Sequence, residues 1–288
     1  MTSAGQKIPV SAIVVTKNEA KRIETCIRAL ERFDEVIVVD SNSTDNTADI
    51  ARENGAKVES FTWNMRYPKK RGWCLNTVKT KHDYILFIDA DEIMTQELAD
   101  EIVDEFGCGK PPAAGYFVSG RYRFEGRVLQ HGLHNKKLCL FDRRKFYFPP
   151  VDDLDLPGMG EIEGHYQPLL KEEYEDEEIG AFKAALIHDA YDNAQHWQER
   201  HERYARWEAG MNERNAWPAE VNALRAFLKA VFRRIPARDI AAFLHCYILK
   251  GGFLDGPAGF RFALSRYRYY RMISDFSASA SKEREKAA

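Results

Sequence analysis

Short apolar runs alternate with helical patterns through the first third of the chain, and this alternation constrains the fold more than any other feature. The runs are Val10–Val15, Glu35–Asp40, Lys57–Phe61 and Tyr84–Ile88. They are rich in β-branched or aromatic residues and are short enough for buried strands. Between the first two, Ile23, Ile27 and Leu30 recur at helical spacing. Strand and helix in this rhythm predict an α/β fold with a mostly parallel, Rossmann-like sheet and helices on both faces.

Polar residues follow three of these predicted strands. They are Thr16, Asn18 and Glu19 after the first, Asp40 and Ser43 after the second, and Asp89, Ala90 and Asp91 after the fourth. In open α/β sheets the ligand binds beyond the carboxyl ends of the strands. We therefore expect the three groups to line one binding site.

The Asp89-Ala90-Asp91 tripeptide is the candidate metal site. Residues two apart at a strand end point the same way, so Asp89 and Asp91 can address one cation. Mg²⁺ and Mn²⁺ take oxygen ligands, commonly one or two carboxylates together with substrate phosphates. Small Ala90 would let the backbone approach a ribose or a diphosphate. An acidic loop without a ligand is the alternative interpretation.

The other groups fit a nucleotide. Asp40 can accept hydrogen bonds from a base or a ribose. Lys70 and Arg71 precede the Asp89 strand and could meet a diphosphate, although a solvated charge run is the usual explanation for such residues. Asn18 and Glu19 could instead serve only to start a helix.

Three segments carry a family resemblance: Ser11–Glu19, Val36–Thr47 and Ile85–Glu92. In this order and spacing they resemble the catalytic domain of glycosyltransferase family 2. Tyr67–Asn76 and Lys250–Gly256 are similar to stretches of the bacterial enzymes that add a glucose to the lipopolysaccharide inner core. The resemblance implies a GT-A fold, a nucleotide-diphosphate sugar donor with UDP-glucose favoured, a divalent cation, and inversion at the anomeric carbon.

The family places its catalytic base downstream of the metal motif, often in a His-Glu or Glu-Asp pair. Here the corresponding stretch, Gly158–His165, has no His-Glu pair. Glu161 is the first choice for the base, and Asp153 and Glu163 are alternatives. His188 resembles a late histidine that returns to the metal or the diphosphate, although a lone histidine after apolar residues is more often structural.

The resemblance and the patterning together divide the chain. Residues 1–192 form the expected catalytic domain, with a nucleotide-binding half over about 8–110 and an acceptor half over 111–192. Residues 193–276 form a helical, basic and aromatic C-terminal extension, and 277–288 a disordered tail. From Arg225 to Arg271 there are ten basic residues against two acidic ones. Such a region suits contact with an anionic membrane, while a helical subdomain packed on the core is the alternative.

Composition narrows the cellular setting. A formal net charge of −2 argues against a nucleic-acid partner. Five scattered cysteines without a CxxC spacing predict reduced thiols, and no signal peptide is evident at the N-terminus; the cysteines are Cys26, Cys74, Cys108, Cys139 and Cys246. We expect a cytoplasmic protein, peripheral to the inner face of the bacterial inner membrane, that acts on a glycan or lipid-linked acceptor.

Two other classes of protein remain open. A nucleotidyltransferase also uses an α/β sheet with acidic metal ligands, but it normally has a Gly-rich loop after the first strand, and Thr16–Glu19 contains no glycine. A non-catalytic nucleotide-sugar-binding protein is the second alternative, and the missing His-Glu pair favours it.

Overall fold

The computed structural model describes residues 7–107, 113–164, 166–189, 191, 193–220 and 223–287, so Cys108 lies outside it. The chain divides into two compact units. Unit 1 comprises 1–122, 135–148 and 167–190, and unit 2 comprises 123–134, 149–166 and 191–288. The C-terminal unit therefore begins close to the expected boundary at 192, but it also takes two segments from the expected acceptor half.

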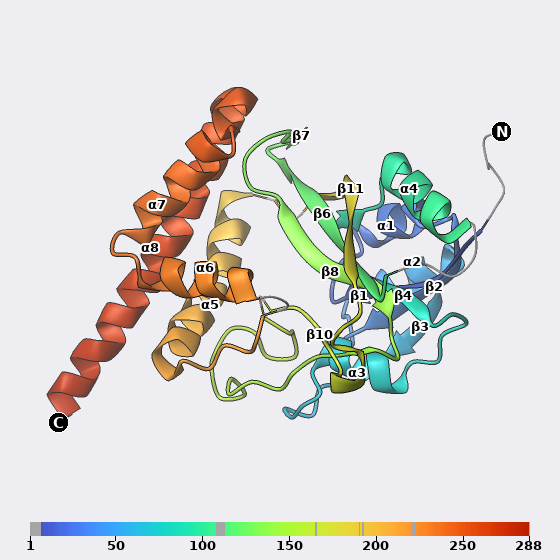
Figure 1. Ribbon diagram of the computed structural model, residues 1–288, viewed down its shortest axis with the longest axis horizontal. Coiled ribbons are helices and arrows are strands. Elements are labelled where there is room, and N and C mark those ends of the chain that lie inside the picture. The colour runs from blue at the N-terminus through green and yellow to red at the C-terminus, as the bar shows by residue number, and fades with distance from the viewer. Residues whose placement is uncertain are drawn as a thin grey trace. The chain divides into compact units, whose positions relative to one another are not determined.

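Unit 1 is built on a mixed sheet in the order β3-β2-β1-β4-β8-β6-β11-β5. Its first half alternates strands and helices (Figure 1): β1 Ile8–Thr16, α1 Ile23–Ala29, β2 Phe33–Asp40, α2 Thr47–Glu53, β3 Lys57–Ser60, α3 Lys70–Thr77 and β4 Tyr84–Asp89. The four strands expected from apolar patterning are all present. They are parallel to one another, as the strand-helix rhythm predicts.

The register of β1 places the three polar groups at one edge of the sheet. Thr16 at the end of β1 pairs with Asp40 at the end of β2. On the other side, Val15 of β1 pairs with Asp89 at the end of β4. The expectation that these groups share an edge is confirmed.

The second half of unit 1 adds strands of mixed direction. Its elements are β5 Glu92–Ile93, α4 Gln96–Gly107, β6 Gly115–Phe124, β8 Asn135–Asp142, β9 Phe146–Tyr147, β10 Leu169–Leu170, η1 Glu172–Tyr174 and β11 Ile179–His188. Strand β8 is antiparallel to both β4 and β6, and β11 is parallel to β6. Sequence patterning does not indicate β11, because few of its residues are fully buried and its apolar residues follow no strict alternation.

Unit 2 is mainly helical, with short β7 Arg127–Val128 paired to the end of β6. Its other elements are α5 Ala194–Arg214, α6 Ala223–Arg234, α7 Arg238–Leu244, the π-helix η2 His245–Leu249, η3 Gly252–Asp255 and α8 Gly256–Ala287. Ala205 and Ala209 of α5 form a core with Tyr269 and Ile273 of α8. No helix among the described residues is long and apolar enough to cross a bilayer.

The expectation of a disordered tail from residue 277 is corrected by the structure. Helix α8 continues through Ala287 without interruption at 277. The residues after Ser277 are small or charged rather than helix-breaking, since alanine, lysine and glutamate are good helix formers and neither glycine nor proline interrupts them.

Candidate active site

The loops that follow β1 and β2 are tied to each other. The Asn18 side-chain oxygen accepts a hydrogen bond from the Thr44 amide at 2.8 Å, and the Asn18 amide donates to Ser43 Oγ at 2.8 Å. The Glu19 amide donates to Thr47 Oγ1, also at 2.8 Å. Asn18 adopts a left-handed backbone with φ 56°, which asparagine tolerates better than most residues. Asn18 and Ser43 therefore fix the conformation of the two loops at this edge of the sheet.

Asp40, Thr16 and Ser41 supply polar atoms beneath these loops. Asp40 is buried, and its carboxylate accepts hydrogen bonds from the amide and hydroxyl of Ser43. The hydroxyl oxygens of Thr16 and Ser41 are buried and have no hydrogen-bond partner among the residues that the structure describes. Buried polar atoms of this kind call for a partner from solvent or ligand, so the edge between β1 and β2 retains hydrogen-bonding capacity for a ligand.

Asp89 lies in a partly buried network of charges. Its carboxylate forms an ion pair with Arg71 of α3 and a second with Lys137 of β8 at 2.8 Å. Lys137 also reaches Glu92 at 2.6 Å. Glu92, which is completely buried, accepts a hydrogen bond from the Asp89 amide at 3.0 Å. Sequence reasoning missed Lys137, because only the pairing of β8 with β4 brings it to this edge.

Neighbouring opposite charges keep Asp89 and Lys137 ionised. Burial alone would raise the pKa of the Asp89 carboxyl, but Arg71 and Lys137 outweigh that effect and hold its pKa well below the usual range. Burial alone would lower the pKa of the Lys137 ammonium, whereas Asp89 and Glu92 raise it above its ordinary value. Two cations and two carboxylates thus compensate one another.

Asp91 faces His188, the last residue of β11. His188 Nε2 lies 3.7 Å from Asp91 Oδ2. The other ring nitrogen, Nδ1, lies 3.5 Å from Glu92 Oε1 and 3.2 Å from the Asn135 side-chain nitrogen. The antiparallel pairing of β11 with β5 sets His188 opposite Glu92. The structure therefore pairs two of the three predicted metal ligands, Asp91 and His188, and Glu92 lies between His188 and Asp89.

The donor atoms fit a divalent cation that would also be bound by the phosphate oxygens of a substrate. Asp91 and His188 offer one carboxylate and one imidazole at adjacent positions. Both oxygens of Asp89 already face cations. Among the described residues there is no cluster of three or more acidic, histidine or cysteine side chains that could chelate a metal ion by itself. Such a site suits Mg²⁺ or Mn²⁺, which complete their coordination with phosphate oxygens and water.

Lys70 and Arg71 begin α3 beside this edge. Lys70 is buried, and its ammonium group lies 3.5 Å from the Thr16 carbonyl oxygen. Arg71 pairs with Asp89. The predicted diphosphate residues therefore lie in the same unit and at the same edge as Asp89, Ala90 and Asp91.

The three candidate bases lie in unit 2, on the segment 149–166. Asp153 is buried, and its carboxylate accepts a hydrogen bond from the Trp207 indole at 2.9 Å. Glu163 is buried as well, whereas Glu161 is partly exposed. Asp153 is thus tied to a structural partner, and Glu161 is the candidate with the most access to solvent.

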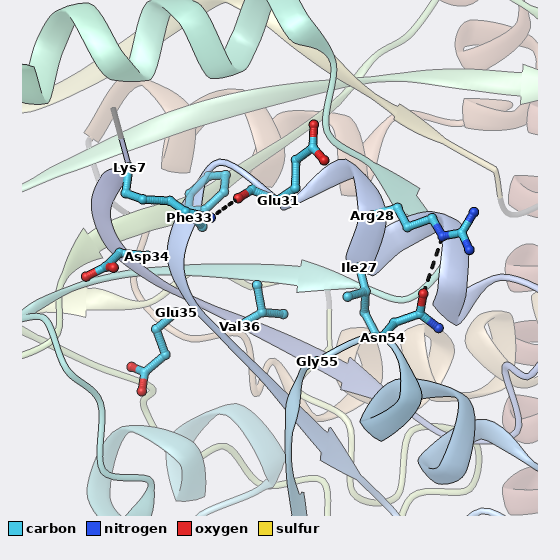
Figure 2. Close-up of a pocket in the computed structure, with 10 residues that line it drawn as sticks. All are labelled: Lys7, Ile27, Arg28, Glu31, Phe33, Asp34, Glu35, Val36, Asn54 and Gly55. Atoms are coloured by element: carbon cyan, nitrogen blue, oxygen red, sulfur yellow. Dashed lines mark hydrogen bonds between the residues drawn. The ribbon is translucent and has the colours of Figure 1, made fainter. Parts of the chain in front are cut away.

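One hollow in unit 1 lies at the opposite end of the strands (Figure 2). Phe33, Asp34 and Glu35 at the start of β2 line it, together with Arg28 and Asn54. The Arg28 guanidinium donates to the Asn54 side chain across it at 3.3 Å. It contains none of the predicted site residues, so we do not assign it to the active site.

Comparison with known proteins decides the family. The family model of glycosyl transferase family 2 matches residues 11–176, more than half of the chain. The chain belongs to glycosyl transferase family 2. The matched range contains Thr16 to Glu19, Asp40, the Asp89-Ala90-Asp91 motif and Glu161, and it ends before His188.

Individual relatives match over shorter stretches. An uncharacterized glycosyltransferase of Rickettsia bellii is 49% identical over 94 residues, which are 32% of this chain and 31% of the relative. The lipopolysaccharide core biosynthesis glycosyltransferase LpsC of Rhizobium meliloti is 32% identical over 124 residues, 40% of this chain and 43% of that protein. The chain thus spans about a third of the Rickettsia relative and under half of LpsC.

A solved structure shows a similarly partial likeness. Glucosyl-3-phosphoglycerate synthase from Mycobacterium tuberculosis, in complex with Mn²⁺, uridine diphosphate and glucosyl-3-phosphoglycerate, is 30% identical. The match covers 42% of this chain and 45% of that one, with a TM-score of 0.32.

Proposed function

We propose that this protein is an inverting glycosyltransferase that moves a hexose from a nucleotide-diphosphate sugar to a lipopolysaccharide core or another cell-surface glycan. The observation that carries the proposal is that Asp91 lies beside His188, while Asp89 closes β4 at the carboxyl edge of the parallel strands. Family membership and the similarity to LpsC support it. Glucose from UDP-glucose is the favoured donor.

The donor would bind along this edge. The nucleoside would lie over β1 and β2, where Asp40 and the buried hydroxyls of Thr16 and Ser41 offer hydrogen bonds. Its diphosphate would approach Ala90, Lys70 and Arg71. Mg²⁺ or Mn²⁺, held by Asp91 and His188 and by the diphosphate, would supply positive charge that offsets the negative charge on the leaving nucleotide.

Arg71 and Lys137 would reduce the negative charge that the diphosphate meets at this edge. Because they neutralise Asp89 and Glu92, the diphosphate approaches an edge that is less negative than three acidic side chains would make it. Arg71 can also turn toward the phosphate oxygens, since guanidinium groups bind phosphate with two parallel hydrogen bonds. Positive charge placed beside the leaving group lowers the barrier to its departure.

Glu161 would act as the catalytic base. In inverting transfer a carboxylate removes the proton from the acceptor hydroxyl while that oxygen attacks the anomeric carbon opposite the leaving diphosphate. The acceptor oxygen gains the bond to the sugar, the anomeric carbon–phosphate oxygen bond breaks, and the electron pair leaves with the nucleoside diphosphate. A positioned base of this kind contributes ~10²–10⁴-fold to the rate. The partial exposure of Glu161 supports this assignment over Asp153.

The acceptor would be a glycan carried on a lipid. We propose that the protein works at the inner face of the bacterial inner membrane, with the basic helices of unit 2 providing peripheral contact with anionic lipid. The ten basic and two acidic residues between Arg225 and Arg271 support this placement.

A panel of nucleotide sugars, each supplied with Mn²⁺ or Mg²⁺, tests the function. Release of a nucleoside diphosphate supports the transferase. Release of pyrophosphate identifies a nucleotidyltransferase instead, and binding without turnover identifies a non-catalytic protein. If an acceptor is glycosylated, the anomeric configuration of the product, measured by nuclear magnetic resonance, distinguishes inversion from retention.

A further inference from the structure

Helix α6 presents four apolar side chains to solvent, whereas three of its four cations contact neighbouring side chains. Leu224, Phe227 and Leu228 are 68%, 64% and 57% exposed, and Val231 one turn later is also exposed. No residue of α6 is buried. A helix on the surface of a globular protein normally shows the reverse pattern, with its apolar stripe against the core.

Three of the four cations of α6 have partners within unit 2, while the fourth, Arg234, is exposed. Arg225 and Lys229 form ion pairs with Glu220, whose side chain is 8% exposed. The Arg233 guanidinium lies 3.9 Å from the centre of the Trp217 ring. Burial lowers the pKa of Lys229, although Glu220 opposes this. These contacts fix the orientation of the helix, so its apolar side cannot turn inward without breaking them.

Phe232 of the same helix lies on the inner side, where its ring meets Tyr270 at 5.1 Å edge to face. Phe227 and Val231, by contrast, are exposed to solvent.

A second group of exposed apolar side chains follows in the same unit. Ile240, Leu244 and Ile248 recur every four residues along α7 and η2, and Leu249, Phe253 and Leu254 continue into η3. All six are exposed, with Leu249 at 76%. Exposed apolar side chains in such number mark a contact surface, since monomeric soluble proteins seldom leave large apolar patches uncovered.

The charged side chains beside these apolar residues indicate that an anionic partner covers the surface. Exposed cations stand beside the apolar side chains, with Arg234 in the last turn of α6 and Lys250 directly after Leu249. The two acids of the region are both engaged inside unit 2. Asp239 is buried, and the Asp255 carboxylate accepts hydrogen bonds from the amides of Gln130 and His131. Ten basic residues outnumber these two acids between Arg225 and Arg271, so the region carries a net positive charge that attracts an anionic surface. Apolar residues next to cations are the pattern of elements that lie in a lipid headgroup layer.

We propose that α6 and the α7–η3 segment form a two-part docking surface for an anionic lipid bilayer, into which the exposed apolar side chains of both parts insert. The proposal deepens the proposed function and rests on it in one respect, since a lipid-linked acceptor would be met at such a surface. It specifies which elements of the basic region contact the bilayer and which of their side chains enter it.

Vesicle binding tests the surface directly. The probes are vesicles of phosphatidylcholine alone and of phosphatidylcholine and phosphatidylglycerol in equal parts, sedimented with the full-length protein. We expect binding to the anionic vesicles only. The triple variant Leu224→Gln, Phe227→Gln, Leu228→Gln should lower the partition coefficient by at least about tenfold, because three inserted side chains lose their apolar burial.

Two matched variants sharpen the result. Tyr147→Gln removes an exposed aromatic residue of unit 1 and should leave vesicle binding unchanged. Arg234→Glu combined with Lys250→Glu should abolish the preference for anionic vesicles. Circular dichroism confirms that each variant retains its helices, which is expected because the substituted side chains are exposed.

Three outcomes would count against the surface. Undiminished binding of the triple variant to anionic vesicles overturns the proposal, as does equal binding of the wild type to neutral and anionic vesicles. If the wild type is a dimer that the triple variant converts to a monomer, and neither binds vesicles, the face joins two copies of the chain instead.

Donor turnover measured without lipid should be equal in wild type and triple variant. If neither turns over any nucleotide sugar, the proposed function fails while the vesicle result still stands on its own.

Discussion

At the scale of single residues, Lys137 is the side chain on which the acidic cluster depends. It lies between the carboxylates of Asp89 and Glu92, at 2.8 Å and 2.6 Å. Glu92 is wholly buried, so its charge has little access to water. Removing one partner from a buried ion pair leaves the other charge uncompensated, which costs more than the pair itself contributes.

We therefore predict that Lys137→Met lowers the free energy of unfolding by about 3 kcal/mol. The neighbouring Lys136→Met is the control, because Lys136 is exposed on the same strand and should change stability by less than about 0.5 kcal/mol. Denaturant titration of both variants measures the difference. Equal stabilities for the two would show that Lys137 does not compensate Glu92.

The base assignment is also tested at single residues. Glu161→Gln should lower kcat by ~10²–10⁴-fold while donor binding persists, because the amide cannot take the acceptor proton. Asp153→Asn should keep most of the turnover, since an amide oxygen can still accept the Trp207 indole hydrogen bond. Steady-state kinetics on both variants and on Glu163→Gln decides the matter. Loss of turnover in Asp153→Asn or Glu163→Gln alone would move the base to that residue.

The motif residues could be predicted from sequence because each lies directly after an apolar strand. Thr16, Asp40 and Asp89 close β1, β2 and β4, and parallel pairing brings strand ends of this kind to one edge. Lys137 and Asn135 follow no such rule. They reach the site only through the antiparallel pairing of β8 with β4 and β6, a long-range contact that leaves no local pattern in the sequence.

At the scale of elements, helix α5 holds the segment that bears Glu161. Three close approaches join them: Gly158 to the Arg203 carbonyl, Gly164 to the Trp207 ring, and Gly210 to Leu156. A Cβ atom on Gly158 would lie 2.3 Å from the Arg203 oxygen, and its φ of +119° disfavours any other residue. The segment can therefore lie against α5 only where these positions lack a side chain.

Gly158→Ala should accordingly lower the free energy of unfolding by about 2–4 kcal/mol, since it combines a clash with backbone strain. Gly107→Ala at the end of α4 is the matched control, because a Cβ there meets no atom of the described residues within 4 Å. Thermal unfolding of the two variants reports the difference. A Gly158→Ala protein as stable as the control would mean that this segment does not pack closely on α5.

At the scale of the whole molecule, donor and metal should stabilise the fold together. A ligand that binds the folded state at a hundred times its Kd adds about 2.7 kcal/mol. We predict that uridine diphosphate with Mn²⁺ raises Tm by more than the sum of the two separate shifts, because the diphosphate completes the coordination offered by Asp91 and His188. His188→Ala should make the shifts additive in a calorimetric scan. Excess stabilisation that persists in this variant would remove His188 from the metal site.

The division into two units was only partly accessible from sequence. Helical patterning indicated a separate C-terminal region from Asn193, and α5 begins at Ala194 with the Asn193 side chain capping it. The transfer of 123–134 and 149–166 to that unit depends on contacts such as Asp153 with Trp207 and Glu125 with Arg261. Pairings between residues so far apart in the chain have no signature in local composition.

Turnover of the nucleotide sugar by Asp91→Asn tests the central claim most directly. The substitution keeps the size of the side chain and removes the charge that faces His188. With Mn²⁺ present, the account predicts that nucleoside diphosphate release falls about a hundredfold or more, whereas Asp49→Asn, which alters an exposed carboxylate on α2, matches the wild type. Both variants should unfold at the wild-type temperature. Turnover by Asp91→Asn at the wild-type rate would contradict the assignment of this edge as the site of transfer.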